Sequence, residues 1–275
     1  MNISNSYDGI SREYFRARKG TPKLAEFVVS HAGLGSNSVD KSVTIVELGV
    51  GGGQQTEFIE KELDAAGISK YSIFAYDKSA DQLGLLKNRI KKGEISDRVI
   101  PTQFDFDGTL LPLESESADL AYMAWVLHHL THQQAVLDDV ARITRRGSKF
   151  FMYQVTIEDL ENHQLDEFFP MKYDYDKQRY PTRPGLKKMF LDAGFTYEEP
   201  HVIKRDNMRL IDRALLESVE NTSIDSVLRM IRDNDPAAFT EGVNRLKREV
   251  ERSERAAKYR NYRTVDRKIF WGIKG

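Results

Sequence analysis

Runs of β-forming residues separated by polar, helix-forming stretches constrain the fold of this chain more than any other feature. Five such runs occur in succession, at Val43–Leu48, Ser72–Tyr76, Arg98–Gln103, Ala118–Ala124 and Lys149–Val155. Most are continuous apolar runs rather than alternating ones, which is typical of strands covered on both faces. Polar helical stretches lie between most of them, so the pattern predicts βαβ units and an α/β fold on a doubly wound, mostly parallel sheet.

Further elements are predicted on either side of this region. Thr21 is a predicted N-cap, followed by Pro22 at the first helical position, and Gly33 is the predicted stop of that helix. Later in the chain, a helix over Leu186–Asp192 leads into a strand at His201–Lys204, and a last strand is predicted at Arg267–Ile273.

The alternation breaks between those last two strands. From about Asn207 to Tyr262, apolar residues recur at helical spacing, as in Met208, Ile211 and Leu215, Val227, Leu228 and Ile231, and Phe239, Val243, Leu246 and Val250. We interpret this stretch as a helical insertion docked on the sheet domain, although helices that simply extend the core fit the pattern equally well. The predicted organisation is a core over residues 1–206 that includes N-terminal helices, a helical insertion over 207–262, and a last core strand over 263–275.

Composition and charge narrow the classes of partner. The 275 residues are 40% hydrophobic and carry a formal net charge of -1, which lacks the basic excess typical of nucleic-acid or anionic-membrane binders. The chain has no cysteine, no apolar run long enough to span a membrane and no export-type leader. These features favour a cytoplasmic protein with a small-molecule or protein partner; the oligomeric state is not predicted.

Three glycines spaced two apart follow the first strand, in the stretch VTIVELGVGGGQQT. A dinucleotide-binding turn needs a further glycine, but both registers place Gln54 or Thr56 there. A phosphate-binding P-loop needs a lysine that is absent. What remains is an acid followed by alternating glycines: Glu47, Gly49, Gly51 and Gly53.

This pattern resembles the first motif of class I S-adenosylmethionine-dependent methyltransferases. The resemblance implies that the bare backbone at Gly49, Gly51 and Gly53 lies against the methionine portion and ribose of the cofactor, where side chains would obstruct it. It also implies that Glu47 accepts a hydrogen bond from the amino group of the cofactor, directly or through water. An ordinary βα turn is the alternative, but such a turn rarely combines three glycines with an acid.

Acidic residues at the ends of the next two strands strengthen the resemblance. Asp77 lies 24 residues beyond Gly53, close to the offset of about 20 at which an acid meets ribose hydroxyls. Asp105 follows the third strand and, with Phe106, is implied to contact adenine. Asp107 fits the commoner family spacing if the register slips; counting along the strand favours Asp105. Each aspartate taken alone is more often a turn or cap residue, and only their joint placement at successive strand ends favours binding.

The fourth strand continues the resemblance in ADLAYMAWVLHHL. It implies that the backbone of Ala124 lies beside the cofactor and that Trp125 forms the adjoining wall. RRGSKFFMYQ resembles the turn and fifth strand of the family, with Arg-Gly-Ser in place of the usual Pro-Gly-Gly. Near the N-terminus, Tyr14 and Arg18 occupy the aromatic and basic positions of a family segment, where Arg18 is implied to pair with the methionine carboxylate; a surface arginine is nearly as good a reading. The resemblance implies a Rossmann-like seven-stranded sheet with an antiparallel last strand, and a helical lid of the type found in small-molecule methyltransferases.

Methyl transfer from a sulfonium needs mainly positioning, because the methyl group is already activated. His128 and His129 are the candidate bases if the acceptor must lose a proton, although capping and packing roles explain both histidines better. Trp125, Tyr153, Tyr175 and Tyr180 are candidate acceptor-binding residues, with loop packing as the alternative for the tyrosines. No metal site is predicted, since His128, His129 and His132 crowd one helical turn.

These features predict S-adenosylmethionine-dependent methylation of a small-molecule acceptor. Two alternatives stay open: a sensor or scaffold that binds S-adenosylmethionine without transferring its methyl group, and a transfer-RNA or protein methyltransferase. For the RNA reading, the basic, tyrosine-containing stretch ERSERAAKYRNYRTVDRK is the only local support, and its acidic residues weaken it.

Overall fold

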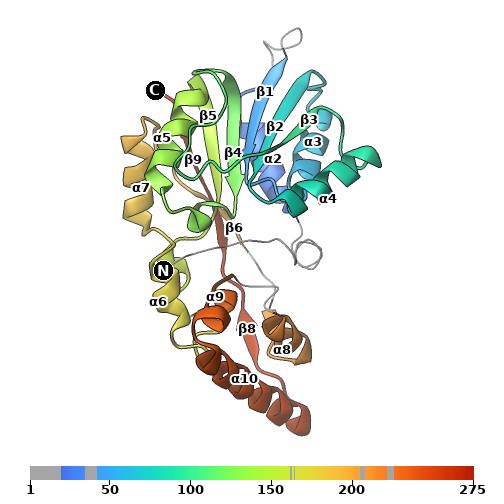
Figure 1. The fold of residues 1–275 in the computed structure, drawn as a ribbon, viewed down its shortest axis with the longest axis vertical. Coiled ribbons are helices and arrows are strands. Elements are labelled where there is room, and N and C mark those ends of the chain that lie inside the picture. The colour runs from blue at the N-terminus through green and yellow to red at the C-terminus, as the bar shows by residue number, and fades with distance from the viewer. Residues whose placement is uncertain (1–19, 35–41, 162, 164, 205–207, 222–225) are drawn as a thin grey trace. The chain divides into compact units, whose positions relative to one another are not determined.

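The chain divides into two compact units (Figure 1). The structure is a computed structural model that describes residues 20–34, 42–161, 163, 165–204, 208–221 and 226–275. One unit, here the sheet unit, comprises the described part of Ser6–Gln154 together with Arg183–Ile203 and Lys268–Gly275. The other, the helical unit, comprises Val155–Thr182 and Lys204–Arg267 among the described residues.

The sheet unit is built on a seven-stranded sheet in the order β3-β2-β1-β4-β5-β9-β6. Its strands are β1 (Val43–Leu48), β2 (Tyr71–Asp77), β3 (Val99–Gln103), β4 (Ala118–Ala124), β5 (Thr144–Gln154), β6 (His201–Ile203) and β9 (Arg267–Ile273). Neighbouring strands from β3 to β5 pair in parallel, whereas β9 pairs antiparallel with β5. The predicted α/β fold, with a mostly parallel doubly wound sheet and an antiparallel last strand, is therefore confirmed.

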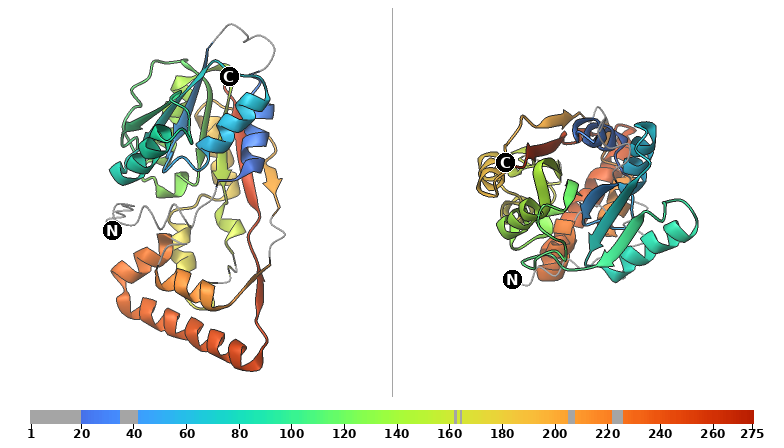
Figure 2. Two further views of the ribbon diagram at one scale, coloured as in Figure 1. Left: turned by 90° about the vertical axis from the view of Figure 1, so that its right-hand side faces the viewer. Right: turned by 90° about the horizontal axis from the view of Figure 1, so that it is seen from above.

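Helices cover both faces of this sheet (Figure 2). Side chains of α2 (Pro22–His31), α3 (Thr56–Ala65) and α4 (Ala80–Lys91) join one apolar core. Those of α5 (Gln133–Ile143) and α7 (Arg183–Asp192) join the other. Successive strand residues alternate between the two cores, so both faces need apolar side chains, and this explains the continuous apolar runs in the sequence.

The start of α2 differs in detail from the prediction. Thr21 occupies the N-cap position, but its side chain makes no capping hydrogen bond. Its hydroxyl instead donates to the Tyr153 hydroxyl at 3.5 Å, and its backbone N–H donates to Gln55 Oε1 at 2.9 Å. Tertiary contacts therefore take the place of the local cap.

The helical unit has its own apolar core. It contains η2 (Ile157–Asp159), α6 (Lys172–Lys177), α8 (Arg213–Glu220), α9 (Ser226–Asn234) and α10 (Pro236–Ala256). Phe169 packs flush on α10, since a Cβ added to Gly242 would lie 2.2 Å from its ring. The bare helix surface at Gly242 thus lets an aromatic ring into the core of this unit.

Two features of the helical unit differ from the sequence-based interpretation. The stretch expected to be helical, residues 207–262, contains strand β7 (Met208–Leu210) and the first two residues of β8 (Asn261–Arg263), and these strands pair antiparallel. The unit also includes Val155–Thr182, which the division at residues 207 and 262 assigned to the core. Both differences arise from contacts between segments far apart in sequence, which local periodicity does not record.

None of the helices in the described part of the chain is both long and apolar enough to cross a membrane.

Candidate functional site

A turn with three left-handed glycines follows β1. Gly49, Gly51 and Gly53 have φ angles of 68°, 56° and 79°. A side chain at Gly49 would meet Val126 Cγ2 at 2.3 Å, and one at Gly53 would meet the side chain of Ile95 at 2.6 Å. At Gly51, by contrast, the nearest atoms to an added Cβ are two glutamine Oε1 atoms at 3.6 Å. Packing therefore requires glycine at the two outer positions, whereas a Cβ at the middle glycine would be in ordinary van der Waals contact and would not clash.

Asp77 ends β2 and holds the middle of this turn. Its Oδ2 accepts a hydrogen bond from the Gly51 N–H at 2.8 Å, and its Oδ1 accepts one from the Ser79 N–H at 2.9 Å. The structure thus brings together two residues that the sequence analysis assigned to one site. Because a carboxylate oxygen can accept more than one hydrogen bond, both oxygens are suited to a diol as well.

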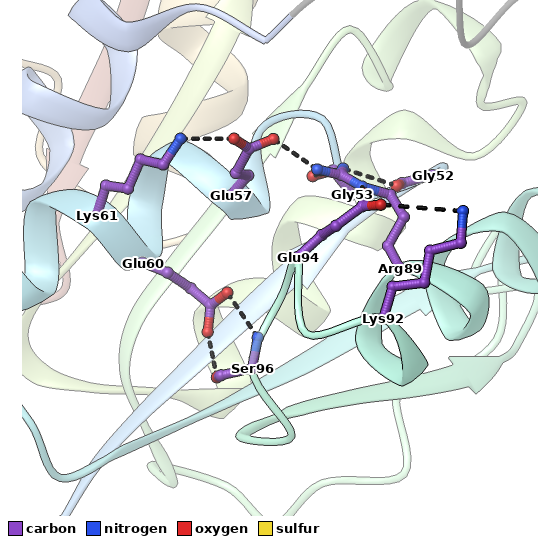
Figure 3. A network of polar contacts seen from close by, with 9 residues as sticks. All are labelled: Gly52, Gly53, Glu57, Glu60, Lys61, Arg89, Lys92, Glu94 and Ser96. Atoms are coloured by element: carbon purple, nitrogen blue, oxygen red, sulfur yellow. Dashed lines mark hydrogen bonds and ion pairs between the residues drawn. The ribbon is translucent and has the colours of Figure 1, made fainter.

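Arg89 on α4 holds the glycine turn by donating hydrogen bonds to carbonyl groups of the turn (Figure 3). Its Nη1 donates to the carbonyl oxygens of Gly52 at 3.2 Å and Gly53 at 2.9 Å. Its Nη2 donates to Glu57 Oε2 at 2.5 Å and its Nε to Glu94 Oε2 at 3.1 Å. Charge-assisted bonds of this kind are among the strongest available to a turn. Sequence reasoning missed Arg89, because it lies more than 30 residues from the carbonyls that it holds.

Glu47, near the end of β1, is buried with 2% of its surface exposed. Burial raises the pKa of Glu47 to about 7, against the lowering effect of the Tyr122 and Thr56 hydroxyls; the negative charges of Asp77 and Glu60 add to the rise. The Thr56 hydroxyl donates to Glu47 Oε2 at 2.7 Å. Glu47 therefore changes its charge near neutral pH, and a cationic amino group beside it would favour the carboxylate form.

The two aspartates after β3 have different surroundings. Asp107 accepts hydrogen bonds from the backbone N–H groups of Thr131 at 2.8 Å and His132 at 2.7 Å. Desolvation acts to raise the pKa of Asp107, but these hydrogen bonds outweigh it and lower the pKa below its ordinary value. Asp107 thus anchors the start of α5. Asp105 is exposed and accepts a bond from the Asp107 N–H at 3.2 Å, while Phe106 is buried in the sheet core.

Trp125 follows β4 in a strained conformation. Its φ angle is +62°, a left-handed value that is unusual for a bulky residue and concentrates at functional sites. Its N–H donates to the Tyr153 carbonyl oxygen at 2.9 Å, and its ring meets the Tyr153 ring edge to face at 5.5 Å. Ala124, directly before it, is half-buried against the same core. The sequence alone carries no signal of this strain.

The two candidate bases lie in the short helix η1 (Leu127–His129) that follows Trp125. His128 is buried with 6% exposed, while His129 is half-buried. Their ring centroids are 4.0 Å apart, and the His128 ring also meets Trp125 edge to face at 6.3 Å. His129 is the more accessible of the two, so it is the better placed to exchange a proton.

The remaining predicted residues are divided among the parts of the chain. Tyr153 is buried in the sheet unit and Tyr175 packs on the core of the helical unit, where Tyr180 is half-buried. Tyr14 and Arg18 lie outside the described residues. Over the described ranges, no group of three or more metal-ligating side chains gathers in one place.

The residues around the glycine turn fit a sulfonium nucleoside. Gly51 offers bare backbone at which an added Cβ would not clash, Asp77 offers carboxylate oxygens suited to a diol, and Glu47 offers an acid that a cation would ionise. In open parallel sheets, ligands bind beyond the carboxyl ends of the strands, where these residues lie.

Comparisons with known proteins agree with this reading. A family model described as a methyltransferase domain matches residues 46–152. No curated protein sequence matches the chain significantly.

Solved structures share the fold at low sequence identity. A candidate methyltransferase from Bacillus halodurans is 14% identical with a TM-score of 0.58, the match covering 92% of this chain and 99% of the other. A candidate methyltransferase solved in complex with the Haloferax volcanii Trm112 methyltransferase activator is 17% identical with a TM-score of 0.57, covering 99% and 97%. The geranyl diphosphate C-methyltransferase of Streptomyces coelicolor is 12% identical with a TM-score of 0.54, covering 92% and 79%. Residues 46–152 therefore match a methyltransferase domain, and the chain shares its fold with solved methyltransferases.

Proposed function

We propose that this protein transfers a methyl group from S-adenosylmethionine to a small-molecule acceptor. The contact between the Gly51 N–H and Asp77 Oδ2, at 2.8 Å, carries the proposed donor site. It joins the one motif glycine at which an added Cβ would not clash to the acid at the tip of the neighbouring strand. A turn tied to a carboxylate in this way is already shaped before a ligand arrives, which lowers the entropic cost of binding.

The residues of the turn hold and orient the donor in this proposal. When bound, S-adenosylmethionine supplies a methyl group on a positively charged sulfur. Asp77 accepts hydrogen bonds from the ribose, Asp105 accepts one from the adenine, and Glu47, in its carboxylate form, accepts one from the amino group. Arg89 keeps the carbonyls of Gly52 and Gly53 in place. Most of the rate then comes from holding the reacting atoms in line, at about 3 to 3.5 Å.

A proton acceptor is needed only for an acceptor that must lose a proton. Of the two predicted bases, we propose His129 for this role, because it is the more exposed, and a packing role for the buried His128. The aromatic pair Trp125 and Tyr153 is proposed to bind the acceptor, supported by the strained backbone of Trp125. For Tyr175 and Tyr180, in the helical unit, acceptor binding stays a prediction.

Two observations support a small acceptor. The net charge of -1 gives the chain little general attraction for nucleic acid. A fold neighbour, the Streptomyces coelicolor enzyme, was solved with geranyl diphosphate, so the same fold admits a small acceptor. A macromolecular acceptor is the main alternative.

Methyl-labelled S-adenosylmethionine with fractionated cell extracts tests the proposal. The protein is incubated with a small-molecule fraction, an RNA fraction and a protein fraction, and both S-adenosylhomocysteine formation and the location of the label are measured. Label in the small-molecule fraction is expected, with the Asp77→Ala variant as the matched control that loses turnover.

The other outcomes would overturn the proposal. Label in RNA or protein would favour a macromolecular acceptor. Binding of S-adenosylmethionine without turnover on any fraction would favour a sensor or scaffold.

A further inference from the structure

A second polar side chain lies beside Gly51 and is not explained by packing. Gln82, in the first turn of α4, is buried with 2% of its surface exposed. Its backbone N–H donates to Ser79 Oγ at 3.3 Å, but neither amide atom of its side chain has a hydrogen-bond partner within the described part of the chain. A buried amide that is left unpaired is costly, so proteins rarely keep one without a reason.

The position of this amide points to the ligand. Gln82 Oε1 lies 3.6 Å from the place where a Cβ on Gly51 would be, and the Gly51 N–H is bonded to Asp77. The Gln82 amide and the Asp77 carboxylate therefore flank the same residue. Gln54 Oε1 lies at the same 3.6 Å, but Gln54 is only half-buried and water can reach it.

The two groups have complementary chemistry toward a vicinal diol. Each hydroxyl group of a diol donates one hydrogen bond and also accepts through its oxygen. An ionised carboxylate only accepts, so Asp77 can serve the hydroxyl hydrogens but not the hydroxyl oxygens. A carboxamide carries two N–H donors in addition to its oxygen, and it supplies what the carboxylate lacks.

We propose that the side-chain amide of Gln82 binds the ribose of the cofactor by donating a hydrogen bond to a hydroxyl oxygen beside Asp77. This inference rests on the cofactor site proposed above. Helix α4 would then have two roles at this site. Gln82 binds the ligand, and Arg89 holds the glycine turn in place.

Calorimetric titration of the purified full chain tests this role. The probes are S-adenosylhomocysteine and its 2′-deoxy and 3′-deoxy forms, and the variant is Gln82→Met, which keeps the length of the side chain and removes the amide. Gln82→Met is expected to weaken S-adenosylhomocysteine binding about 3- to 10-fold, the effect of one lost hydrogen bond. Removing the hydroxyl that Gln82 contacts should weaken binding less in the variant than in the wild type, by the same factor. In the variant this hydroxyl no longer has a hydrogen bond to the amide that its removal could break.

Gln82→Glu separates donation from acceptance. It keeps acceptor oxygens but loses the N–H group and adds a charge near Asp77, so it should bind at least as weakly as Gln82→Met. Wild-type affinity in Gln82→Glu would overturn the donor role.

Thermal unfolding without ligand separates binding from structure. Because the Gln82 amide has no partner among the described residues, Gln82→Met is expected to leave the Tm of the ligand-free protein unchanged or raised. The matched control is Gln55→Met: Gln55 is also buried, but its amide is paired with the backbone of Thr21, so its loss should lower the Tm.

Three results would overturn the inference: unchanged affinity in Gln82→Met, equal deoxy penalties in variant and wild type, or a Tm that falls as far as that of Gln55→Met. Failure of the wild-type protein to bind S-adenosylhomocysteine would instead remove the proposed cofactor site itself.

Discussion

Two carboxylates near neighbouring strand ends have opposite surroundings. Glu47, on β1, is buried beside hydroxyl groups, and burial raises its pKa to about 7. Asp77, on β2, accepts two backbone N–H bonds at the tip of its strand. Because its pKa lies near neutrality, Glu47 needs a cation nearby to ionise fully at neutral pH.

Asp77→Ala is expected to weaken S-adenosylhomocysteine binding by about 1 to 3 kcal/mol, because the ribose hydroxyls and the Gly51 N–H lose their acceptor. Calorimetric titration measures the change. Asp97→Ala, at an exposed aspartate in the loop before β3, is the matched control and should bind as the wild type does. Unchanged affinity in Asp77→Ala would remove Asp77 from the site.

Glu47 should make stability depend on pH. Its folded-state pKa of about 7 lies above the ordinary value of 4.5, so the folded protein holds this proton more tightly than the unfolded chain does. Its contribution is fully present below about pH 4.5 and is lost as pH rises through about 7, amounting to at most about 3 kcal/mol.

Urea unfolding across this pH range, compared between wild type and Glu47→Gln, measures the linkage. The difference in free energy of unfolding between the two proteins should change between pH 4.5 and 7 and be constant above. A difference that stays constant across the whole range would mean that Glu47 titrates normally.

The sequence allowed Asp77 and the motif glycines to be predicted as neighbours because they directly follow apolar strands. The structure joins Asp77 to Gly51, while the role of both in cofactor binding stays a prediction. Arg89 and Gln82 were not found, since an arginine or a glutamine on a helix has no local feature that distinguishes it from a solvated surface residue. Their roles arise only when α4 packs beside the glycine turn.

At the scale of elements, the turn after β1 combines two requirements on glycine. Gly53→Ala is expected to destabilise the fold by about 2 to 5 kcal/mol, because its Cβ would meet Ile95 at 2.6 Å and Leu86 at 2.7 Å in addition to the left-handed strain. Gly51→Ala should cost only about 1 to 2 kcal/mol, the strain alone, since the nearest atoms lie at 3.6 Å.

For cofactor affinity, Gly51→Ala should have the larger effect and Gly53→Ala the smaller, the reverse of their effects on stability. Gly51→Ala adds a methyl group to the turn at the place where the proposal puts the cofactor, and it is expected to weaken S-adenosylhomocysteine binding by about tenfold or more. Urea unfolding and calorimetry on both variants measure the two effects. If folded Gly51→Ala bound as tightly as the wild type, the cofactor could not lie against this glycine.

Strands of the sheet were the most predictable elements. Val43–Leu48, Ala118–Ala124 and Arg267–Ile273 match β1, β4 and β9 at both ends, because strands buried on both faces leave long apolar runs in the sequence. Strands β7 and β8 were not predicted, since each has three residues and they pair across a separation of about fifty. A strand of three residues is too short to show a recognisable alternation of apolar and polar residues.

At the scale of the whole molecule, the two units have separate apolar cores. Phe169 belongs to the core of the helical unit and Phe151 to that of the sheet unit, and both are fully buried. Phe169→Ala should cost about 3 to 5 kcal/mol and lower hydrogen-exchange protection in α8, α9 and α10, while β1 and β4 keep theirs.

Phe151→Ala is the matched variant and should produce the opposite pattern, with lost protection in β4, β5 and β9. Mass-spectrometric hydrogen exchange on both variants measures this. Equal loss of protection across the whole chain in either variant would show that the two cores unfold together.

The predicted division at residues 207 and 262 differs from the extent of the helical unit, which also includes residues 155–182. Residues 155–182 follow β5 and look like a continuation of the sheet domain, but Leu165, Phe168 and Phe169 pack in the helical core. The local sequence around an apolar loop residue does not predict which of two cores the residue will pack in.

The position of β9 has a consequence for synthesis on the ribosome. This strand lies between β5 and β6, yet it follows the whole helical unit in the chain. While residues 204–266 are being translated, the position of β9 in the nascent sheet is therefore empty. The backbone groups of β5 and β6 that pair with β9 are then unpaired. Such edges attract other strands, so we expect this protein to rely on chaperone shielding until β9 has left the exit tunnel.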